Sequence, residues 1–207
     1  YPTKLLVMPI YQNKDETKRG LNHCNFLKKK YNNVDIIKTD LSSIYDNFVD
    51  IIPEDYHSKL SLANTRARIR MTTLYMIAGG CKGIVVGTGN KVEDFGVGFF
   101  TKYGDGGVDI SPIADLMKSE VYELAKDLCI NTEIINASPT DGLWDDGRTD
   151  EEQLGVSYNQ LEWAMLFEEK DSSVFLSEND KDILNKYIKH RSQNLHKMNP
   201  IPIFKKK

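Results

Sequence analysis

The sequence has few cysteines, no long apolar run and no excess of positive charge. Its three cysteines, Cys24, Cys81 and Cys129, are far apart and form no CxxC pair, which disfavours both a disulfide framework and a zinc site. No apolar run approaches the roughly 18 residues of a membrane span, and the opening YPTKLLVMPI lacks the layout of a signal peptide. The net charge of -3 disfavours nucleic acid and anionic membranes as partners. We therefore expect a cytoplasmic protein with buried, reduced thiols.

The composition and the apolar pattern predict one α/β domain over residues 1–207. Hydrophobic residues make up 40% of the chain and charged residues 28%. Apolar runs alternate with helix-favouring stretches, and this order is typical of a doubly wound parallel sheet flanked by helices, with ligands at the carboxyl ends of the strands. The expected strands are Lys4–Pro9, Val34–Thr39 and Gly83–Thr88. The expected helices are Asp15–Tyr31, Leu60–Ala78 closed by Gly79 and Gly80, Lys118–Leu128, Glu151–Met165 and Asp180–His190, with a polar loop at Ala137–Arg148 and an exposed or partner-covered tail.

The glycine-rich stretch GTGNKVEDFGVGFFTKYGDGGVD, residues 87–109, has too much glycine to predict a helix and too much charge for an ordinary core. Thr88 follows an apolar strand, where a hydroxyl and free backbone N–H groups can hold phosphate or a base; a simple strand-ending turn is the alternative. Glu93 offers a hard oxygen ligand suited to Mg²⁺ beside a phosphate. An acid in the first turn of a helix, stabilised by the helix dipole, is the competing explanation.

Further charged residues complete the candidate set. Lys102, Asp105 and Asp109 can project to one side from tight glycine turns while Phe99 and Phe100 anchor the segment, although a solvated hairpin is also open. Lys118 opens a helix, where a cation is unfavourable unless an anion binds nearby. In TRARIR, Arg68 lies on a different helix face from Arg66 and Arg70, and the latter two are the better candidates for solvated arginines.

Covalent catalysis finds no support in the residues. The four histidines show no metal spacing, and no nucleophile has a plausible base beside it. The pattern instead favours chemistry by phosphate positioning and charge stabilisation.

Four stretches carry a family resemblance: NTRARIRMTTLY, IVVGTGNKVEDFGVGFFTKYGDGGVDISPIADLMKSEVYELAK, SPTDGLWDDGRTDEEQLGVSYNQLEWAM and HKMNPIP. In sequence and order they resemble ammonia-dependent NAD⁺ synthetase, an enzyme of the adenine nucleotide alpha hydrolase-like group. The resemblance implies ATP- and Mg²⁺-dependent adenylylation of the carboxylate of deamido-NAD⁺, followed by attack of free ammonia, which releases AMP and NAD⁺. It also implies a homodimer.

The resemblance assigns roles residue by residue. Thr88, Lys118 and Thr140 fall on ATP-contacting positions, and Glu93 falls on the Mg²⁺ ligand. Contacts to deamido-NAD⁺ fall on Arg68, Lys102, Asp109, His196 and Lys197.

One family motif has no counterpart in the sequence. The family's pyrophosphate loop, SGGxDS, belongs just before the strand that begins at Lys4, so we expect the 207 residues to be part of a longer, N-terminally extended enzyme. Two alternatives stay open: another ATP pyrophosphatase such as a GMP synthetase-like protein, and a non-catalytic nucleotide-binding or dimer-forming relative without the loop.

Overall fold

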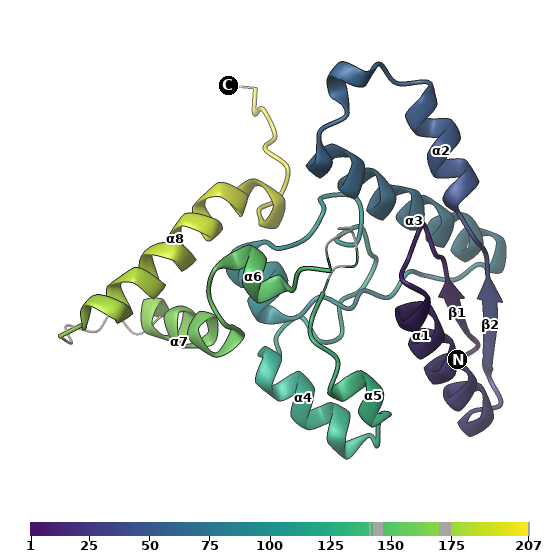
Figure 1. Cartoon of the computed structure of the whole chain (residues 1–207), viewed down its shortest axis with the longest axis horizontal. Coiled ribbons are helices and arrows are strands. Elements are labelled where there is room, and N and C mark those ends of the chain that lie inside the picture. The colour runs from purple at the N-terminus through teal and green to yellow at the C-terminus, as the bar shows by residue number, and fades with distance from the viewer. Residues whose placement is uncertain (141, 143–146, 170–174, 207) are drawn as a thin grey trace.

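The computed structural model describes residues 1–140, 142, 147–169 and 175–206, and within them it has the expected α/β architecture. Strands β1 (Thr3–Val7) and β2 (Val34–Lys38) pair in parallel, in register from Thr3 with Val34 to Val7 with Lys38. Helix α1 (Lys14–Lys30) forms the crossover between them, as a helix usually does between parallel strands. Figure 1 shows this sheet with α1 and α3 at one end of the molecule and α7 and α8 at the other. The predicted α/β fold with a parallel sheet flanked by helices is confirmed.

Helix α1 shows why the first prediction succeeded. The side chain of Asn13 accepts a hydrogen bond from the N–H of Asp15 and so caps the first turn. Acidic residues stand in that first turn and three lysines in the last, which complements the helix dipole.

The next region contains a helix that the sequence pattern did not predict. Helix α2 (Ser42–Asp50) is followed by a 3₁₀ turn, η1 (Glu54–Tyr56), and by the long helix α3 (Lys59–Cys81). A small core of Ile10, Leu41 and Tyr45 joins these elements to the sheet. The expected end of α3 at Gly79 and Gly80 was wrong, because the helix passes through both glycines and ends where Lys82 turns left-handed with φ 54°.

The predicted strand Gly83–Thr88 was also wrong. In the described part of the chain this segment forms only one isolated parallel bridge, between Val86 and Ile110. Backbone hydrogen bonds link Val85 and Gly87 to Asp109 and Ile110 and then stop. Pro112, which has no N–H to donate, follows at once and limits the pairing.

The second half of the chain is helical and holds the larger core. The glycine-rich stretch contains a π-helix, η2 (Lys91–Val97), against our expectation of no helix there. Beyond it lie α4 (Lys118–Asp127), α5 (Thr132–Ile135), α6 (Asp150–Leu154), α7 (Tyr158–Glu169) and α8 (Glu178–Met198). The single helix expected over Glu151–Met165 is divided into α6 and α7, because Gly155 turns left-handed at φ 69°. Residues Val92, Val97, Leu161, Ala164 and Tyr187 belong to the core that joins η2, α7 and α8.

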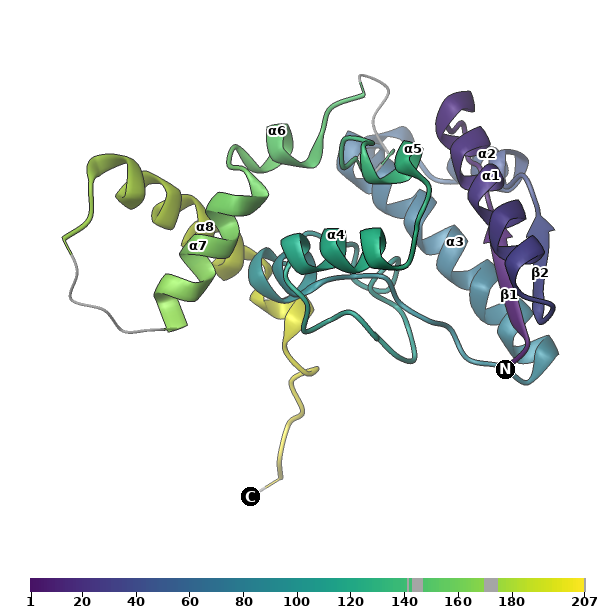
Figure 2. The ribbon, with the colours of Figure 1, turned by 90° about the horizontal axis from the view of Figure 1, so that it is seen from below.

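Other expectations are answered at the surface. Cys24 is half-buried, whereas Cys81 and Cys129 are exposed, so the expectation of three buried thiols was wrong. Ile203 and Phe204 are 80% and 93% exposed, in agreement with an open tail, which Figure 2 shows extending away from α8. Across the described residues, every helix is too short or too polar to cross a membrane.

Candidate functional site

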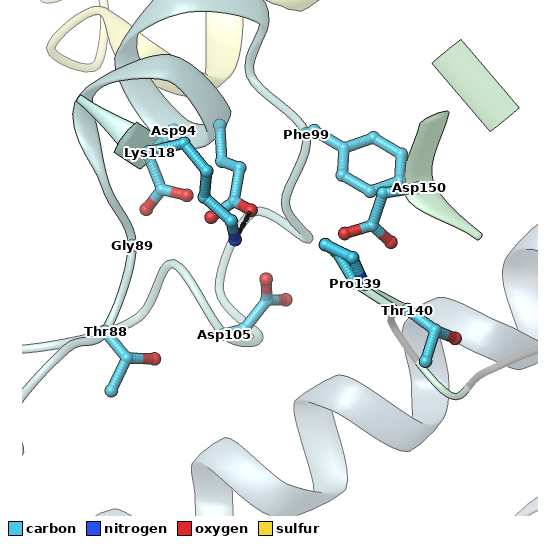
Figure 3. Close-up of a pocket in the computed structure, with 10 residues that line it drawn as sticks. Thr88, Gly89, Asp94, Phe99, Asp105, Lys118, Pro139, Thr140 and Asp150 are labelled. Atoms are coloured by element: carbon cyan, nitrogen blue, oxygen red, sulfur yellow. Dashed lines mark hydrogen bonds and ion pairs between the residues drawn. The ribbon is translucent and has the colours of Figure 1, made fainter. Parts of the chain in front are cut away.

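A pocket of about 250 Å³ lies at the end of the extended segment that leads to Thr88. Figure 3 shows Thr88 and Gly89 on one side, Pro139, Thr140 and Asp150 on the other, and Asp105 between them. Glu93, Asp94, Phe99 and Lys118 complete the lining. Four candidate residues from the sequence, Thr88, Glu93, Lys118 and Thr140, therefore lie around one cavity although they come from three separate segments of the chain.

Glu93 is the centre of a hydrogen-bonded network. Its Oε1 accepts from Nζ of Lys118 at 2.5 Å and from the hydroxyl of Tyr158 at 2.6 Å, while its Oε2 accepts from the side-chain amide of Asn90. Glu93 and Lys118 are each about one-sixth exposed, with side-chain values of 16% and 17%. Lys118 also lies over the ring of Tyr158, 4.8 Å from its centroid. Such partial burial fixes the orientation of both charged groups.

The start of η2 explains the position of Glu93. Oδ1 of Asn90 accepts hydrogen bonds from the N–H groups of Val92 and Glu93, which caps the helix. Glu93 therefore lies in the first turn of η2, where an acid complements the helix dipole, and it also faces the pocket.

Tyr158 connects two carboxylates of the site. Its hydroxyl lies 2.6 Å from Oε1 of Glu93 and 2.8 Å from Oδ2 of Asp150, the buried first residue of α6. Burial, and then the two carboxylates, raise the pKa of Tyr158, so the phenol stays neutral. The tyrosine links α7 to both η2 and α6.

Two further acids line the pocket. Burial, with the nearby carboxylates of Asp105 and Glu93, raises the pKa of Asp94 to about 7. Its carboxylate lies so close to Gly89 that a Cβ there would be 1.8 Å from Oδ2. Loss of surrounding water also raises the pKa of Asp105, whose Oδ1 accepts from the N–H of Thr101 at 3.0 Å. The pocket thus holds more negative charge than Lys118 balances.

Helix α8 brings a second cation close to these acids. Nζ of Lys197 donates to the carbonyl oxygens of Gly98 and Phe100, each at 2.8 Å. Burial lowers the pKa of Lys197, and the charges of Asp105 and Asp94 partly oppose this. Lys197 does not line the pocket itself.

Three other candidates form a separate group, which we call the cationic cluster: Arg68, Lys102 and His196. Nε and Nη2 of Arg68 each lie 3.3 Å from the carbonyl oxygen of Lys102, and Nζ of Lys102 lies 2.5 Å from that of His196. Arg68 and His196 are exposed. The cluster joins α3, the glycine-rich stretch and α8 outside the pocket.

Asp109 is held by the chain's own groups. Its Oδ2 accepts from the N–H of Val85 at 2.7 Å, and its Oδ1 from the hydroxyl of Tyr75 at 3.2 Å. The expectation that Arg66 and Arg70 are the solvated arginines was wrong. Both are half-buried, and Arg70 donates to the carbonyl of Met8 and to Oε1 of Gln12, each at 3.0 Å.

Several site residues were not singled out as candidates: Asn90, Asp94, Asp150 and Tyr158. Tyr158 is 65 positions from Glu93 in the chain, and only the packing of α7 against η2 brings them together. The one available signal for Asp150 was its place after Thr149, whose side chain caps α6.

Comparison with known proteins identifies the group. The sequence profile of NAD synthase matches residues 3–201. The chain belongs to the NAD synthase family. Among its relatives, an NH(3)-dependent NAD(+) synthetase of Carboxydothermus hydrogenoformans is 40% identical over 170 residues, 80% of this chain and 68% of that protein.

Two solved structures of this kind have similar folds. The NMN synthetase of Francisella tularensis superposes with a TM-score of 0.82 at 29% identity, covering 98% of this chain and 78% of that one. The NH3-dependent NAD synthetase of Campylobacter jejuni superposes with a TM-score of 0.76 at 27% identity and the same coverage. In three curated relatives of this kind, the matched region spans between 52% and 68% of their lengths.

Proposed function

We propose that this NAD synthase family member is an ammonia-dependent NAD⁺ synthetase, a ligase that forms a C–N bond. The proposal rests on one observation above the others: the family match extends over residues 3–201, and the residues expected to contact ATP and Mg²⁺ surround a single pocket. This juxtaposition disfavours the GMP synthetase-like alternative and the non-catalytic one.

The proposed chemistry explains why the pocket needs cations and fixed polar groups. A carboxylate oxygen of deamido-NAD⁺ attacks the α-phosphorus of ATP, and pyrophosphate leaves. Ammonia then attacks the carbonyl carbon of the acyl adenylate, loses a proton, and AMP departs with the attacking oxygen. Both partners of the first step are anions, so the protein must hold them together against their repulsion.

For ATP we propose Thr88, Lys118 and Thr140 as contacts. Thr88 is exposed at the pocket edge, and its backbone follows Gly87, where a Cβ would be 2.8 Å from Val108. Lys118 offers a positive charge at the first residue of α4. In the present structure the Lys118 ammonium group donates to Oε1 of Glu93, and a bound phosphate would replace Glu93 as its acceptor.

The pocket also suits Mg²⁺, with Glu93 as the residue that would hold it. The described residues contain no group of three or more His, Cys, Asp or Glu side chains that could hold a metal by themselves. Phosphate oxygens and water would therefore complete the coordination of Mg²⁺. Burial, and after it the nearby carboxylates of Asp105 and Glu93, raises the pKa of Asp94, and a cation bound at Glu93 would lower it again. When bound, Mg²⁺ neutralises charge on the phosphates.

For deamido-NAD⁺ we propose the cationic cluster, together with Asp109 and Lys197. The cluster's exposed Arg68 and His196 are free of acidic partners in the described structure, and this supports a role in binding an anionic dinucleotide.

A product assay tests the proposed function. The purified full-length protein, supplied with deamido-NAD⁺, ATP, Mg²⁺ and ammonium, should form NAD⁺ and AMP in equal amounts. Omission of ammonium should stop NAD⁺ formation. Hydrolysis of ATP without any NAD⁺ would contradict the proposal.

A second candidate is suggested by the NMN synthetase with a TM-score of 0.82. Synthesis of NMN would amidate the corresponding acid mononucleotide in the same way. Competition between the dinucleotide and mononucleotide acids distinguishes the two: we expect a higher kcat/KM for deamido-NAD⁺, and the opposite preference would favour the second candidate.

We further propose a cytoplasmic homodimer. Exposed apolar side chains gather on and after α2, among them Ile44 at 53%, Phe48 at 46% and Ile51 at 75% exposure. Clusters of this kind commonly mark protein interfaces. Sedimentation should show a dimer that Ile51→Asp converts to a monomer.

A further inference from the structure

The C-terminal end of η2 leaves backbone oxygens without partners inside the helix. The carbonyl of Glu93 accepts from the N–H groups of Gly98 and Phe99, and there the intrahelical pattern ends. The last carbonyl groups of any helix need donors from elsewhere. In η2 these include the oxygens of Phe95, Gly96 and Val97.

Helix α8 supplies the missing donors from one of its faces. Nη1 of Arg191 donates to the oxygens of Phe95 at 2.5 Å and Gly96 at 3.0 Å. Nδ2 of Asn194 donates to that of Val97 at 2.9 Å. Arg191, Asn194 and Lys197 follow at three-residue spacing, so they lie along the same side of the helix. Together they bind five carbonyl oxygens between Phe95 and Phe100.

The fit between the two helices is close as well as polar. Gly98 adopts the left-handed φ of 65°, and a Cβ on it would lie 2.6 Å from Cβ of Asn194. Only a residue without a side chain permits this approach. Arg191 is further oriented by Glu168, whose Oε2 is 3.7 Å from its Nε.

We propose that Arg191 and Asn194 are positioning residues of the pocket, acting through η2. They fix the carbonyls of residues 95–97. The N–H groups of Gly98 and Phe99, next along the chain, hold the backbone of Glu93. Glu93 and Phe99 both line the pocket, so α8 sets where they face. This rests on the proposed function only in taking MgATP as the pocket's ligand.

Asn194→Ala and Asn194→Asp test the proposal, with Gln193→Ala as a matched control on the exposed side of the same turn. Loss of the donor should speed hydrogen exchange at Gly98 and Phe99 about tenfold, while α1 keeps its protection. The affinity for MgATP, measured by calorimetry without turnover, should fall about tenfold in Asn194→Ala. It should fall further in Asn194→Asp, which places a carboxylate against the oxygen of Val97. Gln193→Ala should match the wild type.

Arg191 provides the conservative comparison. Arg191→Lys can still donate to one carbonyl and should retain more MgATP affinity than Arg191→Met. Faster exchange at Gly98 and Phe99 with unchanged MgATP affinity in the Asn194 variants would mean that the contact only stabilises the fold, which would overturn the proposal. Unchanged exchange would overturn it too. A wild type that binds MgATP but forms no NAD⁺ contradicts only the proposed function, because the calorimetric comparison still decides the role of α8.

Discussion

The pocket and the cationic cluster are built differently. In the pocket, side chains bind one another: Glu93 contacts Lys118, Tyr158 and Asn90, and Tyr158 reaches Asp150. In the cationic cluster, the hydrogen bonds that the described structure gives Arg68 and Lys102 go to backbone oxygens, and Arg68 is exposed. The pocket is therefore ordered before a ligand arrives, whereas the cluster keeps its charges available for one.

This difference suggests a division of work. A preorganised pocket stabilises charge that develops during reaction, and so its residues should affect kcat. An exposed cluster contributes binding that is equal in ground and transition states, which changes KM. The predictions below probe that division.

Glu93→Gln should have the largest effect. The amide removes the charge that Lys118 contacts and that Mg²⁺ would use, so the rate of AMP formation should fall at least about a thousandfold. Circular dichroism should show an unchanged fold. Glu123→Gln, at an exposed position of α4, serves as the control. Near-normal activity of Glu93→Gln would remove Glu93 from the metal site.

Asp94→Asn should change how stability depends on pH. The pKa of Asp94 is about 7 in the folded protein, against about 3.9 in an unfolded chain. Between these values the unfolded state loses its proton first, so this carboxyl lowers stability as pH rises from about 4 to about 7. At pH 7 the asparagine variant should be more stable by on the order of 3 kcal/mol, with no gain near pH 4. Urea titrations at both pH values measure this. Equal gains at both would contradict it.

Gly98→Ala should destabilise the pocket side of the molecule. Alanine resists the left-handed φ of 65° and its Cβ would overlap Asn194. We expect a loss of about 2 kcal/mol in the free energy of unfolding. Gly147→Ala, with a similar φ of 68° but open space around it, separates backbone strain from crowding. The stability losses of Gly98→Ala and Gly147→Ala should differ by the cost of crowding against Asn194. Equal losses would show that α8 moves to make room for the new Cβ.

Arg68→Ala should have the smallest effect and a different kinetic form. Because Arg68 is exposed and, within the described residues, hydrogen-bonds to a backbone oxygen, the melting temperature should hardly change. KM for deamido-NAD⁺ should rise about tenfold, while kcat and KM for ATP stay near the wild type. A fall in kcat instead would break the division between pocket and cluster.

Local pattern was enough to predict the first βαβ unit. The strands β1 and β2 are short apolar runs, and α1 between them is a charged helix with a capped N-terminus. The bounds of all three differ from the expected ones by only a few residues. The segment Gly83–Thr88 is equally apolar. A strand also needs a partner long enough to pair with, and the segment opposite, around Ile110, is ended by Pro112. Partner length is not a local property of a sequence.

The site could be predicted only in part for the same reason. Thr88 was recognisable because it follows an apolar run, and Glu93 and Lys118 because each stands in the first turn of a helix. Tyr158 and Asp94 were not, since their roles depend on contacts with distant segments and on burial. The π-helix was missed because glycine content disfavours a helix, and the donors on α8 that hold it lie about a hundred residues away.

The path of one oxygen atom tests the central claim most directly. Deamido-NAD⁺ labelled with ¹⁸O in both carboxylate oxygens is incubated with the full-length protein, ATP, Mg²⁺ and ammonium, and the products are weighed by mass spectrometry. If the pocket joins the carboxylate to the α-phosphorus, AMP carries one ¹⁸O and NAD⁺ keeps the other. Unlabelled AMP, with NAD⁺ formed, would show that the amide arises without an acyl adenylate and would contradict the account.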